Sequence, residues 1–231
     1  MNLVALREVL VKRGNAVVST SELSRFSGVN QRTTLQYAMR MVKKDLLLKV
    51  ERGKYSVSSD PFDVAPQLVF PSYISFAAGL YLQGYLDQEV NAIDVVSSKK
   101  HSEVSFSGAV IRFSRVDPRM MFGFKKMKHG GFYLFVGDLE KIIIDILYMP
   151  RKTRMNNLST VMKDADVKKL LGFAQRAGSE AINRRLGYAL DFFGVSHDIK
   201  VGSATKYKLN PSITDKGIYN AKWKLYINDE L

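Results

Sequence analysis

The fold of the first part of this chain is decided by residues 19–57, which read STSELSRFSGVNQRTTLQYAMRMVKKDLLLKVERGKYSV. Ser19 and Glu22 have the spacing of a capping box. In that motif the serine hydroxyl accepts the third backbone N–H of a helix, and the glutamate reaches back to the N–H of the capping residue. The pattern therefore predicts a short helix that starts at about Thr20.

Two residues mark the turn after that helix. Gly28 can adopt the left-handed conformation that a sharp turn needs, and Asn30 is a favourable N-cap for a further helix over residues 31–45. Helical spacing places Leu35, Met39, Val42 and Leu46 on one face, which is predicted to be buried. The opposite face is predicted to be exposed and to carry Thr33, Tyr37, Arg40 and Lys44, with Gln36 at its flank and Gln31 and Arg32 on the first turn.

A basic hairpin is predicted directly after this helix. Two β-prone runs, residues 46–50 and 54–58, lie on either side of Glu51-Arg52-Gly53. Upstream, apolar residues recur at helical spacing within residues 2–13, so an amphipathic helix is expected to begin the chain. The first sixty residues thus predict three helices and a hairpin.

The order of a short helix, a glycine turn, a polar-faced helix and a basic hairpin resembles bacterial and archaeal winged-helix regulators. Asp45 departs from that pattern, because many such domains have glycine between the helix and the strand; aspartate tolerates the geometry less well than glycine but better than most residues. The alternative is a protein-interaction module whose polar faces are only solvated. The resemblance implies DNA binding, with candidate contacts at Gln31, Arg32, Thr33, Thr34, Gln36, Tyr37, Arg40, Lys44, Arg52 and Lys54.

Composition favours a polyanionic partner. The 231 residues carry a formal net charge of +13, and residues 1–60 contain eleven Lys/Arg against five Asp/Glu. Such a balance is typical of proteins that bind nucleic acid, although charge alone does not separate DNA from acidic proteins or anionic lipid. The chain lacks cysteine, and we expect neither a secretory signal nor a membrane-spanning run, which predicts a cytoplasmic protein without membrane contact.

The remainder of the chain predicts a second, larger domain. Prolines at 61, 66 and 71 predict a stiff, extended linker over residues 60–71, between a domain of residues 1–59 and one of residues 72–231. The predicted fold class is α+β, with a winged helix-turn-helix followed by a mixed α/β domain. Its helices are expected at 72–85, from Asp138 to Pro150 and at 179–193, and its strands at 92–97, 110–116, 121–127, 132–136, 205–209 and 222–227.

The order of segments along nearly the whole chain resembles one family. The segments VFPSYISFAAGLYLQGY, AIDVVSS, IRFSRV, DLEKIIIDILYMP, INRRLGYALDFFGV and KGIYNAKWKLYIN are similar to the AbiEi-type antitoxins, which are predicted transcriptional regulators of viral defence systems. The resemblance implies a regulator that binds double-stranded DNA in its own promoter, at repeat sequences, and represses its operon. It also implies that the C-terminal domain counteracts a toxin with a nucleotidyltransferase fold.

Catalytic chemistry is not predicted. A nucleotidyltransferase needs a Gly-Ser turn followed closely by paired carboxylates, and neither Gly178-Ser179 nor Gly202-Ser203 is followed by such a pair. The three histidines lie far apart in sequence, so we expect no metal site and no cofactor. The lysines in and just after the predicted 121–127 strand form either a solvated face or a second contact with phosphates. Together with the arginines on the outward face of helix 179–193, they give the candidate secondary phosphate contacts Lys125, Lys126, Lys128, Arg184 and Arg185.

Two further functions remain open from the sequence. One is a stand-alone winged-helix transcription factor whose C-terminal domain binds an effector or dimerises. The other is an enzyme with an accessory winged helix. A nucleotidyltransferase-like reading frame immediately downstream would favour the antitoxin hypothesis over both.

Overall fold

The computed structural model describes residues 2–88, 90–153 and 155–231. The chain is a mixed α+β protein, as predicted, and its contacts divide it into two compact units. Unit 1 consists of Met1–Ile74, Val90–Val116 and Lys125–Val136, and unit 2 consists of Ser75–Glu89, Asp117–Phe124 and Gly137–Leu231. The predicted linker at residues 60–71 therefore lies inside unit 1, and the chain passes between the units several times.

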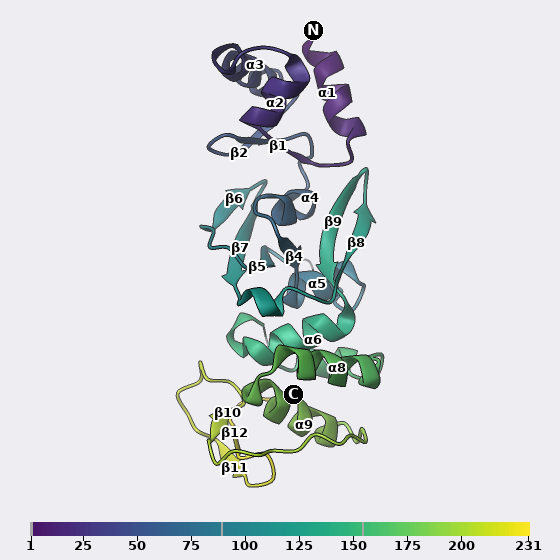
Figure 1. Ribbon diagram of the computed structural model, residues 1–231, viewed down its shortest axis with the longest axis vertical. Helices are drawn as coiled ribbons and strands as arrows, with labels where there is room; N and C mark the ends of the chain where they lie inside the picture. Colours follow the sequence, from purple (N-terminus) through teal and green to yellow (C-terminus); the bar gives the residue numbers. More distant parts are fainter. Residues whose placement is uncertain (1, 89, 154) are drawn as a thin grey trace. The chain divides into compact units, whose positions relative to one another are not determined.

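Unit 1 begins with an N-terminal module of helices and a small sheet (Figure 1). The strands of this sheet run in the order β1-β3-β2, and both pairs are antiparallel. The core of the module is formed by Leu6, Leu10, Leu23, Met41 and Leu47, with Tyr55 from the hairpin. The elements are α1 (Leu3–Lys12), β1 (Val17–Ser19), α2 (Thr20–Ser27), α3 (Gln31–Lys43), β2 (Leu48–Glu51) and β3 (Lys54–Ser56).

Local sequence explains where these helices begin and end. The predicted capping box is present: the Ser19 hydroxyl accepts the Glu22 N–H, and a Glu22 carboxylate oxygen accepts the Ser19 N–H at 2.8 Å. Gly28 ends α2 with a φ of 70°, and the Asn30 side chain accepts the Thr33 N–H at 3.0 Å to start α3. Asp45 has a φ of 53°, so the position where related patterns have glycine does require left-handed backbone.

Residues 60–71 are not an extended linker. They contain α4 (Pro61–Val64) and the 3₁₀ helix η1 (Ala65–Gln67), and Phe62 and Val64 are buried. Asp60 caps α4, because its Oδ1 atom accepts the Phe62 N–H at 2.8 Å. Proline is compatible with this arrangement because the first turn of a helix leaves its N–H groups without helical partners.

A six-stranded mixed sheet completes unit 1 (Figure 1). Its strand order is β6-β7-β5-β4-β9-β8; β5 pairs parallel to β7, and β4 lies between β5 and β9. The predicted hairpin around Gly130-Gly131 is confirmed as β8 and β9, and the predicted strand at 92–97 is confirmed as β5. The strands are β4 (Ser72–Ile74), β5 (Ala92–Ser97), β6 (Val104–Phe106), β7 (Ala109–Arg115), β8 (Phe124–His129) and β9 (Phe132–Gly137).

The helix expected at 72–85 is shorter than predicted. Its first residues form the buried strand β4, and helix α5 (Phe76–Leu82) follows in unit 2. An apolar run of this length does not by itself distinguish a buried strand from a buried helix. The pairing of Ser72, Tyr73 and Ile74 with β5, a tertiary contact, decides the outcome.

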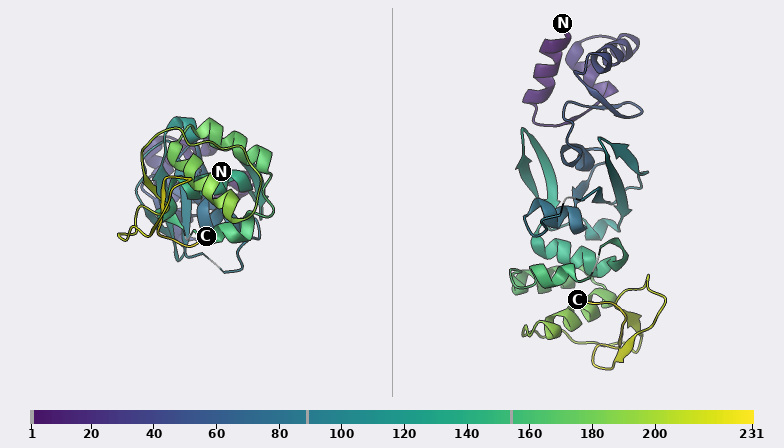
Figure 2. Two further views of the ribbon diagram at one scale, coloured as in Figure 1. Left: turned by 90° about the horizontal axis from the view of Figure 1, so that it is seen from below. Right: turned by 180° about the vertical axis from the view of Figure 1, so that it is seen from behind.

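Unit 2 is mostly helical, and Figure 2 gives further views of its helices and of its small C-terminal sheet. Within this unit α6, α8 and α9 pack against one another, and the small sheet has the order β10-β12-β11. Besides α5, its elements are η2 (Pro118–Met120), α6 (Leu139–Tyr148), η3 (Pro150–Lys152), α7 (Asn157–Val161), α8 (Val167–Ala177), α9 (Glu180–Phe192), β10 (Tyr207–Lys208), β11 (Ile218–Asn220) and β12 (Leu225–Ile227).

Helix α6 is buried along nearly its whole length, including its polar residues. The ammonium group of Lys141 contacts Oδ1 of Asp145, and the Ser75 hydroxyl donates to Oδ2 of the same carboxylate at 2.7 Å. Asp145 is thus part of a buried ion pair within α6. Among the residues that the structure describes, none of the helices combines the length and apolar character needed to cross a bilayer.

Candidate nucleic-acid interface

Helix α3 presents one long face to solvent. It packs against α2, and its fully buried residues are Thr34, Ala38 and Met41. The residues between these positions are therefore directed outward. The exposed side chains of α3 are Gln31, Arg32, Leu35, Gln36, Met39, Arg40 and Lys43.

The predicted burial of this helix is partly wrong. Val42 and Leu46 pack against the core as expected, but Leu35 and Met39 are 44% and 71% exposed. Both stripes have helical spacing, and the prediction chose the one with larger apolar side chains. The structure instead buries the stripe with the smaller side chains Thr34 and Ala38, and the buried Thr34 hydroxyl donates to the Asn30 carbonyl at 2.9 Å.

The candidate DNA contacts on α3 separate into two groups. Thr34 is 0% exposed and is removed from the candidate surface, and Tyr37 packs against the core of the module. Thr33 is half-buried. The remaining candidates are exposed together at the same face or at its C-terminal end: Gln31, Arg32, Gln36, Arg40 and Lys44.

The exposed face of α3 is electrostatically uniform. Residues 31–44 contain four cationic side chains and no aspartate or glutamate. The helix C-terminus, where Lys43 and Lys44 lie, is also the end that the helix dipole makes favourable for cations. Amide, guanidinium and apolar side chains alternate along this face, which suits it to a polyanion with hydrogen-bonding groups.

The β2–β3 hairpin adds a further exposed cation. Arg52 lies at the turn beside Gly53, which has a φ of 76°, and it is exposed. Lys54 was also a predicted DNA contact, but its Nζ atom is 2.8 Å from Glu51 Oε1 and also donates to the Leu68 carbonyl. The charge of Lys54 is therefore compensated within unit 1, and Arg52 is the stronger candidate for a phosphate contact.

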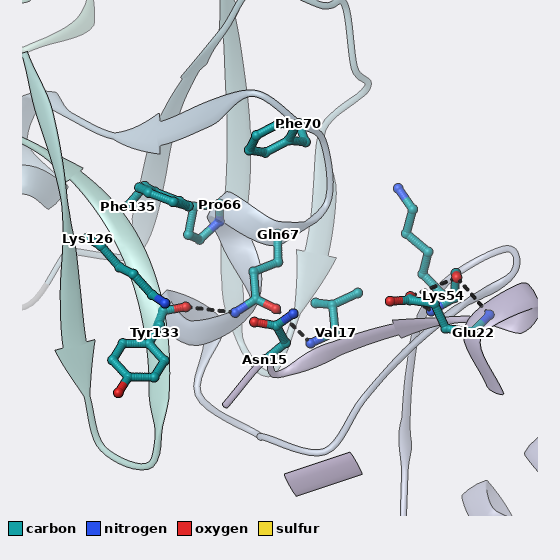
Figure 3. A pocket seen from close by; sticks show the side chains of 11 residues that line it. Asn15, Val17, Glu22, Lys54, Pro66, Gln67, Phe70, Lys126, Tyr133 and Phe135 are labelled. Carbon is teal, nitrogen blue, oxygen red and sulfur yellow. Dashed lines mark hydrogen bonds between the residues drawn. The ribbon is translucent and has the colours of Figure 1, made fainter. Parts of the chain in front are cut away.

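A cavity of about 340 Å³ lies beside this module in unit 1 (Figure 3). Its lining includes Glu22, Lys54 and Lys126. Gln67 crosses it: Oε1 accepts the Val17 N–H at 3.0 Å, and Nε2 donates to the Tyr133 carbonyl at 3.0 Å. One amide side chain thus connects β1 of the N-terminal module to β9.

Glu22 anchors the start of α2 at the edge of this cavity. Its carboxylate bonds Ser19 and pairs with Arg13 Nη2 at 2.7 Å. Partial burial raises the pKa of Glu22, but the hydrogen bonds from Ser19 and the charge of Arg13 outweigh burial and leave this pKa below its ordinary value. The carboxylate is therefore a structural group of the module.

Of the candidate secondary phosphate contacts, the lysines are exposed and the arginines are buried. Lys125, Lys126 and Lys128 lie on β8 and are exposed, and the Lys126 ammonium is 4.0 Å from the centroid of the Tyr133 ring. Arg184 and Arg185 were expected on the outward face of α9, but both are buried in unit 2. They are removed from the set of candidate phosphate contacts.

Hydrogen bonding explains the burial of these arginines. Arg184 donates to the carbonyls of Trp223 and Ser203, and Arg185 donates to the carbonyls of Leu147 and Lys208. Burial lowers the pKa of Arg185 to about 10. The five donors of a guanidinium allow it to satisfy several backbone carbonyls at once, a use that the charge pattern of a helix does not reveal.

The sequence missed Lys43, Leu35 and Met39 as members of the exposed face. Counting from the Asn30 cap with the small residues Thr34 and Ala38 as the buried stripe would have found them. Comparison with known proteins adds no assignment, since neither a family model nor a curated protein matches this chain.

Proposed function

We propose that residues 1–59 form a winged helix-turn-helix that binds double-stranded DNA, with α3 in the major groove. The observation that carries this proposal is the exposed face of α3, on which Arg32, Gln36, Arg40 and Lys43 lie together without an acidic residue. A B-form major groove is about 12 Å wide and admits one α-helix. Proteins that use this motif insert the second helix of the pair into the groove.

The local architecture supports the same proposal. The connection between α2 and α3 is Gly28-Val29-Asn30, with left-handed backbone at the glycine and a side-chain cap at the asparagine. Such a tight connection holds two helices at a steep angle. The β2–β3 hairpin follows α3 after a few residues and exposes Arg52, the position that a wing uses to reach the backbone beside the groove.

Side-chain chemistry assigns roles within this interface. Gln36 and Arg40 are one turn apart near the middle of the exposed face, where an amide can pair with adenine and a guanidinium with guanine. Arg32, Lys43, Lys44 and Arg52 lie nearer the ends of the helix or on the hairpin, and we assign them to phosphates. Lys54 is left out because Glu51 compensates its charge.

The biological setting stays a prediction from the family resemblance. That resemblance implies binding at the chain's own promoter, repression of the operon and neutralisation of a nucleotidyltransferase-like toxin. The cytoplasmic location is likewise a proposal that accompanies DNA binding.

The proposal is tested by substitutions on the α3 face. With a duplex from upstream of the reading frame, Gln36→Ala and Arg40→Ala should each weaken binding by about 1–3 kcal/mol and leave binding to an unrelated duplex nearly unchanged. Arg52→Ala should weaken binding to both duplexes alike. Lys168→Ala, an exposed helical cation in unit 2, is the control. Unchanged affinity in all three interface variants, with the fold intact, would refute this surface.

A further inference from the structure

Three side chains with metal-binding atoms meet in unit 1. Asp60 is the N-cap of α4, Asp63 is on α4, and His129 ends β8. One ligand atom from each lies within 4.8 Å of the others. His129 is 66 residues from Asp63 in sequence, which explains why ligand spacing along the chain predicted no site.

In each carboxylate, one oxygen accepts a hydrogen bond from a neighbouring residue, and the other oxygen is directed at His129. Asp63 Oδ2 accepts the Ser58 hydroxyl at 2.7 Å, and Asp60 Oδ1 accepts the Phe62 N–H at 2.8 Å. The other oxygens face the imidazole: Nδ1 of His129 is 2.9 Å from Asp63 Oδ1 and 3.8 Å from Asp60 Oδ2. Hydrogen bonds that orient ligating carboxylates in this way are a regular feature of metal sites.

The burial of Asp63 favours a bound cation at this cluster. The side chain of Asp63 is only 5% exposed, whereas those of Asp60 and His129 are 41% and 31% exposed. Without a metal, Asp63 is hydrogen-bonded to the Ser58 hydroxyl and to His129 Nδ1, and neither partner carries a positive charge while the imidazole is neutral. A metal ion bound to both carboxylates and to neutral imidazole would supply that charge, and the exposed side of the cluster would give it access.

We propose that Asp60, Asp63 and His129 bind one divalent transition-metal ion of the zinc class. Ligands about 2.0–2.1 Å from a tetrahedral Zn²⁺ are about 3.3 Å from one another, and the two measured separations lie on either side of that value. Two carboxylate oxygens and one imidazole nitrogen leave a fourth position for water. Mg²⁺ and Ca²⁺ fit less well because they prefer six or more oxygen ligands.

The bound ion would link α4, which follows the β2–β3 hairpin closely, to the β8–β9 hairpin. Both lie in unit 1, so the expected consequence is greater stability of that unit in the presence of metal. This inference does not depend on DNA binding, and it can be tested on the full chain without DNA.

The test is a calorimetric titration of chelator-treated protein with ZnCl₂. We expect one ion per chain and a rise in the unfolding temperature with added zinc. His129→Ala should weaken zinc binding by more than about tenfold. His101→Ala is the control, because among the described residues the His101 ring pairs with one carboxylate, that of Glu51.

A conservative variant distinguishes loss of a metal ligand from loss of the fold. Asp60→Asn keeps an effective helix cap but removes a charged ligand, so it should fold normally and bind zinc more weakly than the wild type. The proposal is overturned if the wild-type chain shows no saturable binding. It is also overturned if His129→Ala and Asp60→Asn bind zinc as tightly as the wild type, since the ion would then be held elsewhere.

Discussion

Leu35 and Met39 lie one helical turn apart on the exposed face of α3, where soluble proteins rarely keep adjacent large apolar side chains without a partner. Arg32, Arg40 and Lys43 share that face. Because the charged side chains on this face of α3 are all cationic, a nucleic acid suits the face better than an apolar protein surface. In the major groove, the apolar group available to such side chains is the C5-methyl group of thymine.

The first prediction concerns those methyl groups. If α3 binds in the major groove, replacing thymine by deoxyuridine throughout the target duplex should weaken binding severalfold, because only the methyl contacts are lost. Met39→Ala should reduce this difference between the two duplexes. Equal affinity for both duplexes, in a protein that still binds DNA tightly, would refute methyl contact without refuting DNA binding.

The second prediction compares the stability effects of replacing a buried arginine, Arg184, and an exposed one, Arg40. Arg184→Ala removes donors from the carbonyls of Trp223 and Ser203, the first of them buried, so it should lower the free energy of unfolding by about 2–4 kcal/mol. Arg40→Ala, on an exposed helix face, should change it by less than about 0.5 kcal/mol. Denaturant titration of both variants measures this, and similar stabilities would contradict the burial of Arg184.

The third prediction tests the packing of α9 in unit 2. A methyl group at Gly187 would lie 2.1 Å from the Trp223 ring, whereas Gly172 in α8 has nothing within 4 Å of that position. Gly187→Ala should therefore cost about 1–3 kcal/mol through overpacking. Gly172→Ala should be neutral or stabilising by up to about 1 kcal/mol, because alanine favours a helix. Thermal unfolding should show a lower unfolding temperature for Gly187→Ala and an unchanged or higher one for Gly172→Ala; a Gly187→Ala variant as stable as the wild type would contradict the tight packing against Trp223.

The fourth prediction follows from the lowered pKa of Glu22. Its interactions with Ser19 and Arg13 favour the ionised form, so they stabilise the fold above pH 4.5, the ordinary pKa, and are lost as the pH falls through the lower folded value. Glu22→Gln should cost about 0.5–1.5 kcal/mol at neutral pH. That difference should shrink in acid, and a difference independent of pH would refute the role of the charge.

Local signals predicted the N-terminal module well. The Ser19–Glu22 capping box, the Gly28 turn, the Asn30 cap and the left-handed backbone at Asp45 all depend on residues adjacent in sequence. Such interactions form between near neighbours and so can be inferred from the sequence alone.

Features that depend on tertiary contacts were harder to predict. The orientation of α3 is set by close packing against α2, and the burial of Arg184 is set by carbonyls from distant loops. The cluster of Asp63 and His129 forms only because the sheet brings β8 to α4. Hydrophobic spacing does not contain this information, which explains why these residues were misassigned or missed.

The central claim, that the α3 face and Arg52 bind duplex DNA, is tested most directly by measuring affinity against salt concentration on the upstream duplex. The four exposed cations assigned to phosphates, Arg32, Lys43, Lys44 and Arg52, predict that log K falls against log salt with a slope of roughly −4. Arg52→Ala should reduce the magnitude of that slope by about 1. A flat salt response, or the same slope for wild type and Arg52→Ala, would contradict the claim.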